Sequence, residues 1–143
     1  MARGDYVTFE EAKAYMMDGG WEAADDIKIA ILDNTTTPTA SDATPALADY
    51  TEVGTAGTYT AGGTSIGTWG NFITEAGGTV TGDSATNPTW AQDASNDTDA
   101  YWGLLYNDDQ SDAAIGFIDL GGPVDMSAGP LTINGNASGY FTF

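Results

Sequence analysis

The sequence predicts an all-β fold: a single β-sandwich, jelly-roll or immunoglobulin-like, with one short N-terminal helix. Two observations predict it. The spacing of apolar residues changes from a helical period to alternation near Asp25, and from Tyr50 onward short β-like runs alternate with glycine turns. Regularly spaced short strands with turn signals are typical of sandwiches and barrels. We therefore divide the chain into an N-terminal arm that carries the helix, residues 1–25, and a β-sandwich domain, residues 26–143.

The helix is predicted from about Phe9 to Asp18. Thr8 has the position of an N-cap and Glu11 that of the N3 residue in a capping box, while Gly19-Gly20 supplies a stop. A helix this short needs packing to persist, and Trp21 just beyond it is the expected anchor. The apolar stripe available for packing consists of Phe9, Ala12 and Met16.

A strand is predicted from Ile27 to Asp33, where isoleucines alternate with other residues, and it is followed by a long loop, Asn34–Asp49. Gly62 and Gly63 are expected to form a tight turn that needs a positive φ or a close backbone approach. Large apolar side chains flanked by strand residues are usually buried, so Trp90 and Trp102 are expected in the interior. The later strand-like runs are Tyr50–Val53, Tyr59–Ala61, Thr79–Thr81, Thr89–Ala91, Ala100–Tyr106, Ala114–Leu120, Leu131–Ile133 and Tyr140–Phe143.

The chain is strongly acidic. Its 21 Asp and Glu residues outnumber 3 Lys and Arg, giving a formal net charge of −18 at pH 7, and it contains no His and no Cys. This composition excludes imidazole and thiolate chemistry. All three cations, Arg3, Lys13 and Lys28, precede Ile29, so no basic patch for nucleic acid is expected over most of the length.

No apolar stretch is long enough to span a bilayer, so no membrane partner is expected either. Three explanations of the acidic surface remain open. It keeps a concentrated protein soluble by self-repulsion, it suits a saline medium, or it docks onto a basic partner.

Carboxylates are the only acid–base candidates, and we expect no enzyme. A glycosidase needs two carboxyl groups about 5–9 Å apart across a cleft, and Trp69, Trp90 and Trp102 could line one. However, the sequence shows no neighbouring groups that would tune the pKa of a catalytic carboxyl group.

One polar segment, Asn107–Asp112, is rich in oxygen ligands, which makes Asp108, Asp109 and Asp112 weak candidates for binding Ca²⁺. The segment lacks the glycine and the final glutamate of an EF-hand loop, and Asn and Asp are ordinary turn residues. We therefore favour a hairpin turn here, with no metal site and no cofactor.

Several motifs, taken in order, resemble those of a known family. Gly57–Gly63 is similar to a "GxGYTAGG"-like turn, and Gly116–Gly121 to a late "IGYIDFG"-like strand. Together with the strand at Asp26–Asp33, they resemble small virion structural proteins of tailed bacteriophages over most of residues 9–143. The resemblance implies an all-β virion component, and we expect a capsid decoration (cement) protein that stabilises the outer capsid surface. The implied partners are the major capsid protein and copies of the chain itself, most simply a homotrimer about a capsid axis.

Partner contacts are expected at both chain ends, because the N-terminal arm holds the only cations and the C-terminus is apolar. A tail or neck adaptor, or a host-attachment component, is the alternative function. A carbohydrate-binding module or hydrolase ranks after both. The residues expected to bind partners are Arg3, Phe9, Lys13, Met16, Trp21, Lys28, Tyr140, Phe141 and Phe143.

Overall fold

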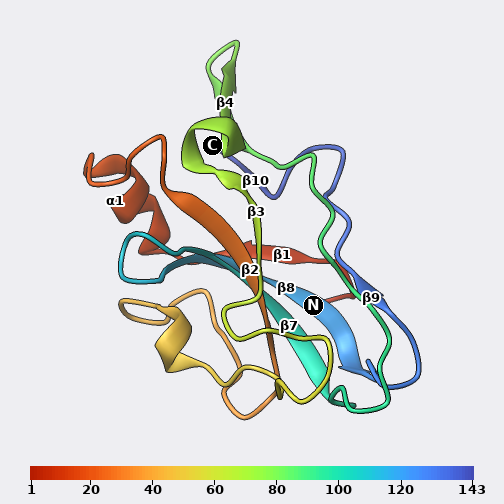
Figure 1. Cartoon of the computed structure of the whole chain (residues 1–143). Helices are drawn as coiled ribbons and strands as arrows, with labels where there is room; N and C mark the ends of the chain where they lie inside the picture. Colours follow the sequence, from red (N-terminus) through yellow and green to blue (C-terminus); the bar gives the residue numbers. More distant parts are fainter.

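The computed structural model describes residues 1–143 and is mostly β, with 36% of residues in strands and 9% in helices. An antiparallel sheet of five strands lies at its centre (Figure 1). Its order is β1 (Tyr6–Thr8), β8 (Ala113–Val124), β7 (Ala100–Asn107), β2 (Asp26–Leu32) and β3 (Thr64–Thr68). The all-β prediction is therefore confirmed.

The three middle strands of this sheet are buried on both faces, which explains their long apolar runs. Alternate residues of β2 enter two separate core clusters, since successive side chains of a strand point to opposite faces. Ile27, Ile29 and Ile31 belong to the larger cluster, whereas Ala30 and Leu32 belong to the smaller one.

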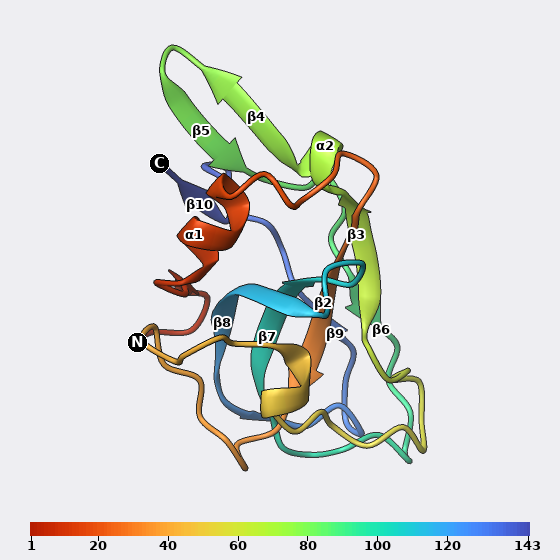
Figure 2. The same ribbon diagram turned by 90° about the vertical axis from the view of Figure 1, so that its left-hand side faces the viewer.

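Two smaller antiparallel sheets contribute to the larger cluster through residues such as Trp90, Leu131 and Phe141. The three-stranded sheet has the order β10 (Phe141–Thr142), β5 (Thr79–Gly82) and β4 (Ile73–Ala76), and the two-stranded sheet pairs β6 (Thr89–Trp90) with β9 (Leu131–Thr132). The hairpin formed by β4 and β5 projects away from the rest of the molecule (Figure 2). The strands thus divide among three sheets of five, three and two strands.

The N-terminal helix is shorter than predicted. Helix α1 runs over Ala12–Met17, and its N-cap, Glu11, makes no side-chain capping bond. The predicted capping box is wrong, because Thr8 lies in β1, where it pairs with Gly116 of β8. The backbone N–H of Phe9 continues this ladder by donating to Ile115. Residues assigned to the N-terminal arm thus supply an edge strand of the main sheet.

Two predicted strands are not strands in the structure. Within Tyr50–Val53 only Glu52 makes an isolated β-bridge, to Leu32, and Tyr59–Ala61 leads into a turn. The remaining helices are one-turn elements, the 3₁₀ helix η1 (Leu47–Asp49) and α2 (Trp69–Phe72). No helix has the length and apolar character needed to cross a membrane.

Candidate functional site

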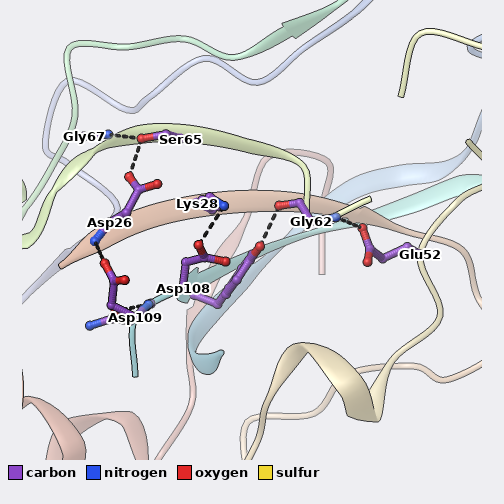
Figure 3. A network of polar contacts seen from close by, with 10 residues as sticks. Asp26, Lys28, Glu52, Gly62, Ser65, Gly67, Asp108 and Asp109 are labelled. Atoms are coloured by element: carbon purple, nitrogen blue, oxygen red, sulfur yellow. Dashed lines mark hydrogen bonds and ion pairs between the residues drawn. The ribbon is translucent and has the colours of Figure 1, made fainter. Parts of the chain in front are cut away.

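The turn at Gly62-Gly63 is held by a carboxylate and two phenols. Glu52 Oε2 accepts a hydrogen bond from the Gly62 N–H at 2.7 Å (Figure 3). It also accepts one from the Tyr59 hydroxyl at 2.5 Å. The Tyr106 hydroxyl donates to the Gly62 carbonyl at 2.6 Å. Gly62 and Gly63 have φ of 86° and 70°, and a Cβ on Gly63 would collide with the carbonyl of Ile29. The predicted tight turn is confirmed. Its hydrogen bonds and its close approach to Ile29 hold the turn against the central sheet.

Lys28 forms the only ion pair of the chain. Its Nζ lies 2.7 Å from Oδ2 of Asp108, which lies in the turn after β7 (Figure 3). The hydrogen bond that Lys28 donates to Asp108 is the main cause of a raised Lys28 pKa, and the charges of Asp108, Asp26 and Asp112 add to it. The Lys28 ammonium is therefore already engaged within the chain, which leaves less of it for a partner.

The candidate calcium ligands lie in a hairpin turn between β7 and β8, as the favoured interpretation predicts. Ser111 and Asp112 adopt positive φ values of 55° and 56° there. Asp109 Oδ2 accepts a hydrogen bond from the Asp26 N–H at 2.8 Å, so this carboxylate ties the turn to β2. Burial and then the charge of Asp108 raise the pKa of Asp112. No group of three or more carboxylates is arranged to hold a metal ion.

The structure places helix α1 beside the C-terminal residue. The ammonium of Lys13 on α1 lies 5.5 Å from the ring centroid of Phe143, the last residue. Phe143 exchanges two backbone hydrogen bonds with Val80 of β5, at 2.8 and 3.0 Å, which fix its position beside the hairpin. Met17 follows Lys13 by four residues and therefore shares its helix face.

We call Lys13, Met17, Val80 and Phe143 the terminal patch. Met17 is 86% exposed and Phe143 47% exposed, so both offer apolar surface to a partner. Lys13 is exposed and has no carboxylate partner. Met17 and Val80 are not among the partner residues predicted from the sequence, although the i, i+4 spacing from Lys13 is a signal that identifies Met17.

Three other residues expected to bind partners are part of the core. Phe9 is fully buried and packs against Phe117 with ring centroids 5.2 Å apart. Tyr140 and Phe141 are each 6% exposed and belong to the larger core cluster. Direct contact with a partner would require these side chains to leave the core.

The expected partner residues near α1 are partly buried. Met16 packs against both core clusters. Trp21 packs edge-on against Trp69 of α2, with ring centroids 4.7 Å apart. This packing agrees with the expectation that Trp21 anchors the helix region.

Arg3 lies beside a surface cavity of about 580 Å³. Its aliphatic stem packs over Gly121, and it forms no ion pair. Two of the lining residues, Tyr6 and Tyr140, have enclosed hydroxyls without a hydrogen-bond partner. Burial is the main cause of the raised Tyr140 pKa, about 12. Because both hydroxyls are enclosed, they do not present polar atoms to a ligand in the cavity.

The tryptophans do not form a common sugar-binding platform. Trp69 packs on Trp21, Trp90 lies near Tyr59, and Trp102 packs edge-on against Phe117. Burial of Trp90 is confirmed, at 5% exposure. Trp102 is only partly buried, contrary to expectation, because its Nε1–H reaches out to Asn34 Oδ1 at 3.1 Å.

Comparison with known proteins finds no relative of this chain. No protein-family model matches the chain, and neither a curated protein nor a solved structure matches it.

Proposed function

We propose that this protein is a non-enzymatic structural component of a phage virion, a capsid decoration (cement) protein on the outer capsid surface. It binds the major capsid protein and copies of itself and stabilises the lattice. One observation carries the proposal: Lys13 of α1 lies over the exposed ring of Phe143, and the exposed Met17 lies one helical turn from Lys13.

The terminal patch has the chemistry of a protein contact. Burying its exposed apolar side chains against a partner supplies favourable binding free energy, roughly 25 cal/mol for each Å² of apolar surface removed from water. Lys13 adds an unpaired positive charge on a chain of net charge −18. A partner surface that combines apolar residues with a carboxylate therefore meets less repulsion here than on the acidic remainder.

The proposal is tested by adding purified protein to undecorated capsids and measuring bound protein by sedimentation and cryo-electron microscopy. Phe143→Ala and Lys13→Glu should each weaken binding by roughly tenfold, the equivalent of about 1.4 kcal/mol. Thr142→Ala is the matched control, since Thr142 is exposed on the neighbouring strand position and points to the opposite face. Equal binding by Phe143→Ala and Thr142→Ala would show that the terminal patch does not contact the capsid.

Cryo-electron microscopy of whole virions distinguishes the capsid surface from the alternative locations of the protein. Density at the tail or neck alone would support an adaptor or host-attachment component instead of a cement protein. A carbohydrate-binding role would use the cavity beside Arg3, and glycan binding without capsid binding would favour it. The homotrimer and the single jelly-roll or immunoglobulin-like sandwich stay predictions, on which the proposed capsid contact does not depend.

A further inference from the structure

The β4–β5 hairpin has a free strand edge on its outer side. The sheet order β10-β5-β4 gives β4 one neighbour only. Its turn, Gly77-Gly78, has φ of 60° and 85°, the left-handed pair expected for a two-residue hairpin. Residues 74–79 are exposed, and the hairpin stands clear of the body (Figure 2).

The backbone groups on this free edge follow from the register. Val80 and Gly82 direct their backbone groups to the β10 side, where Val80 N–H donates to Phe143 at 3.0 Å and Tyr140 N–H donates to Gly82 at 2.7 Å. Since these groups alternate along a strand, the cross-strand partners of Val80 and Gly82, which are Glu75 and Ile73, direct theirs outward. The Ile73 N–H is taken by the Trp69 carbonyl. Glu75 N–H, Glu75 C=O and Ile73 C=O therefore remain on the open edge.

This edge lacks three of the features that prevent strand pairing, namely proline, basic side chains and a bulge. β4 contains no Pro, Lys or Arg, and its register with β5 is unbroken by a bulge. The free edge of β3 differs, because the Ile66 carbonyl accepts a hydrogen bond from Ser84 Oγ at 2.5 Å and the pairing with β2 contains a bulge. The edge of β4 is thus the more accessible of the two.

Charge indicates which partner can approach this edge. Between Val53 and Gly82 the only charged residue is Glu75, in a chain with 21 acidic and 3 basic residues. The Glu75 carboxylate accepts a hydrogen bond from Gly78 N–H at 2.8 Å, which directs it to its own turn. A second copy, which carries the same net charge, meets the least repulsion where charge is depleted.

We infer that β4 pairs antiparallel with β4 of a second copy, joining the two three-stranded sheets about a two-fold axis at Thr74. Glu75 N–H donates to the Ile73 carbonyl of the partner copy, and the symmetric bond forms in return. The two Thr74 side chains then face each other as a non-hydrogen-bonded pair, and the two Glu75 carboxylates stay apart. This pairing concerns the free protein and does not depend on the capsid role.

A backbone-specific variant pair tests the inference by sedimentation equilibrium at about 0.01 M and about 1 M NaCl, where the Debye length is about 30 and 3 Å. The wild type should dimerise with increasing concentration, and more tightly at high salt. Glu75→Gln keeps the N–H and removes a charge, so it should dimerise more tightly still. Glu75→Pro removes the outward N–H, a change tolerated at an edge, and should be monomeric at both salt levels. A monomeric wild type under all conditions, or equal dimerisation of both variants, would overturn the inference.

A cross-linking experiment gives an answer even if Glu75→Pro fails to fold. The chain has no Cys, so Thr74→Cys introduces a single thiol at the proposed axis. Non-hydrogen-bonded pairs bring Cβ atoms close to disulfide distance, so oxidation should yield a covalent dimer. Thr81→Cys, on the same face but on β5, is the matched control and should stay monomeric. Cross-linking of both variants equally, or of neither, would contradict the proposed pairing.

Discussion

The hydroxyl of Tyr59 donates a 2.5 Å hydrogen bond to Glu52 and accepts one of 3.0 Å from the backbone N–H of Ile31 on β2. One phenol therefore joins the Gly62-Gly63 turn to the central sheet. Tyr59 is 2% exposed and Ile31 is fully buried, so the Ile31 N–H has no water as a ready substitute for the phenol. Burial is the main cause of its raised pKa, and the bond to Glu52 adds to it.

Tyr59→Phe should lower the free energy of unfolding by about 1–3 kcal/mol, because it leaves the Ile31 N–H without a partner in the core. Urea unfolding followed by fluorescence measures the change. Tyr101→Phe is the control, since Tyr101 is only partly buried and its hydroxyl makes no hydrogen bond within the chain. A Tyr59→Phe variant as stable as Tyr101→Phe would show that the turn does not depend on this phenol.

Gly63→Ala should cost more than about 3 kcal/mol, because it adds a collision with the Ile29 carbonyl to the strain of a positive φ. Gly77→Ala has a similar φ of 60° but open space around the new methyl group, so it should cost only about 1–2 kcal/mol. Thermal and urea unfolding of the two variants separate the contributions. Equal losses would mean that the chain relaxes freely around Gly63.

Asp25 should contribute to acid stability. Burial raises the pKa of its carboxyl group, but hydrogen bonds from Asn107, from the Glu22 N–H and from Gln110 outweigh burial, and the net shift is downward from 3.8. A lowered pKa in the folded state stabilises the protein above the unfolded value, and this contribution is lost as the pH falls through the folded value. The Asp25→Asn variant should therefore lose less unfolding free energy than the wild type as the pH falls from about 5 to about 2.

The matched control for this prediction is Asp99→Asn, because Asp99 is exposed and makes no hydrogen bond within the chain. Its acid profile should follow that of the wild type. If Asp25→Asn and the wild type lose stability in parallel, the hydrogen-bonded carboxylate is not the source of the acid dependence.

Deletion of Met1–Gly20 should unfold the protein or leave it strongly destabilised, since it removes β1 and the fully buried Phe9. Replacement of a buried Phe by Ala alone costs about 3–5 kcal/mol. Deletion of Met1–Arg3 should leave the fold intact, because the ladder contact of Gly4 with Asp119 remains. Circular dichroism and melting compare the two truncations. A folded, stable product of the longer deletion would support an independent arm instead.

Salt should stabilise the monomer. The chain has one ion pair for 21 carboxylates, so most negative charges lack a local counter-charge. Raising NaCl from about 0.01 M to seawater strength shortens the Debye length from about 30 Å to less than 8 Å and should raise the melting temperature. EDTA should leave the melting temperature unchanged, and a fall after EDTA would indicate bound divalent cations.

The sequence by itself determined the features that depend on local pattern. The alternating isoleucines of β2, the apolar runs of β7 and β8, the Gly62-Gly63 turn and the Asp108–Asp112 turn all lie where the sequence predicts them. Each has a signal within a few residues, either the period of the apolar side chains or glycine and Asx turn chemistry.

Tertiary structure alone decided which distant segments meet. Thr8 follows the local rule for a helix cap, yet it is a strand residue because its backbone pairs with Gly116. Lys13 and Phe143 form one patch only because β10 places the last residue beside α1. Pairing between strands uses backbone groups that every residue type carries, so side chains do not record which strand will be the partner. Register, edge exposure and the contact between α1 and the C-terminal residue therefore emerge only once the whole core is packed.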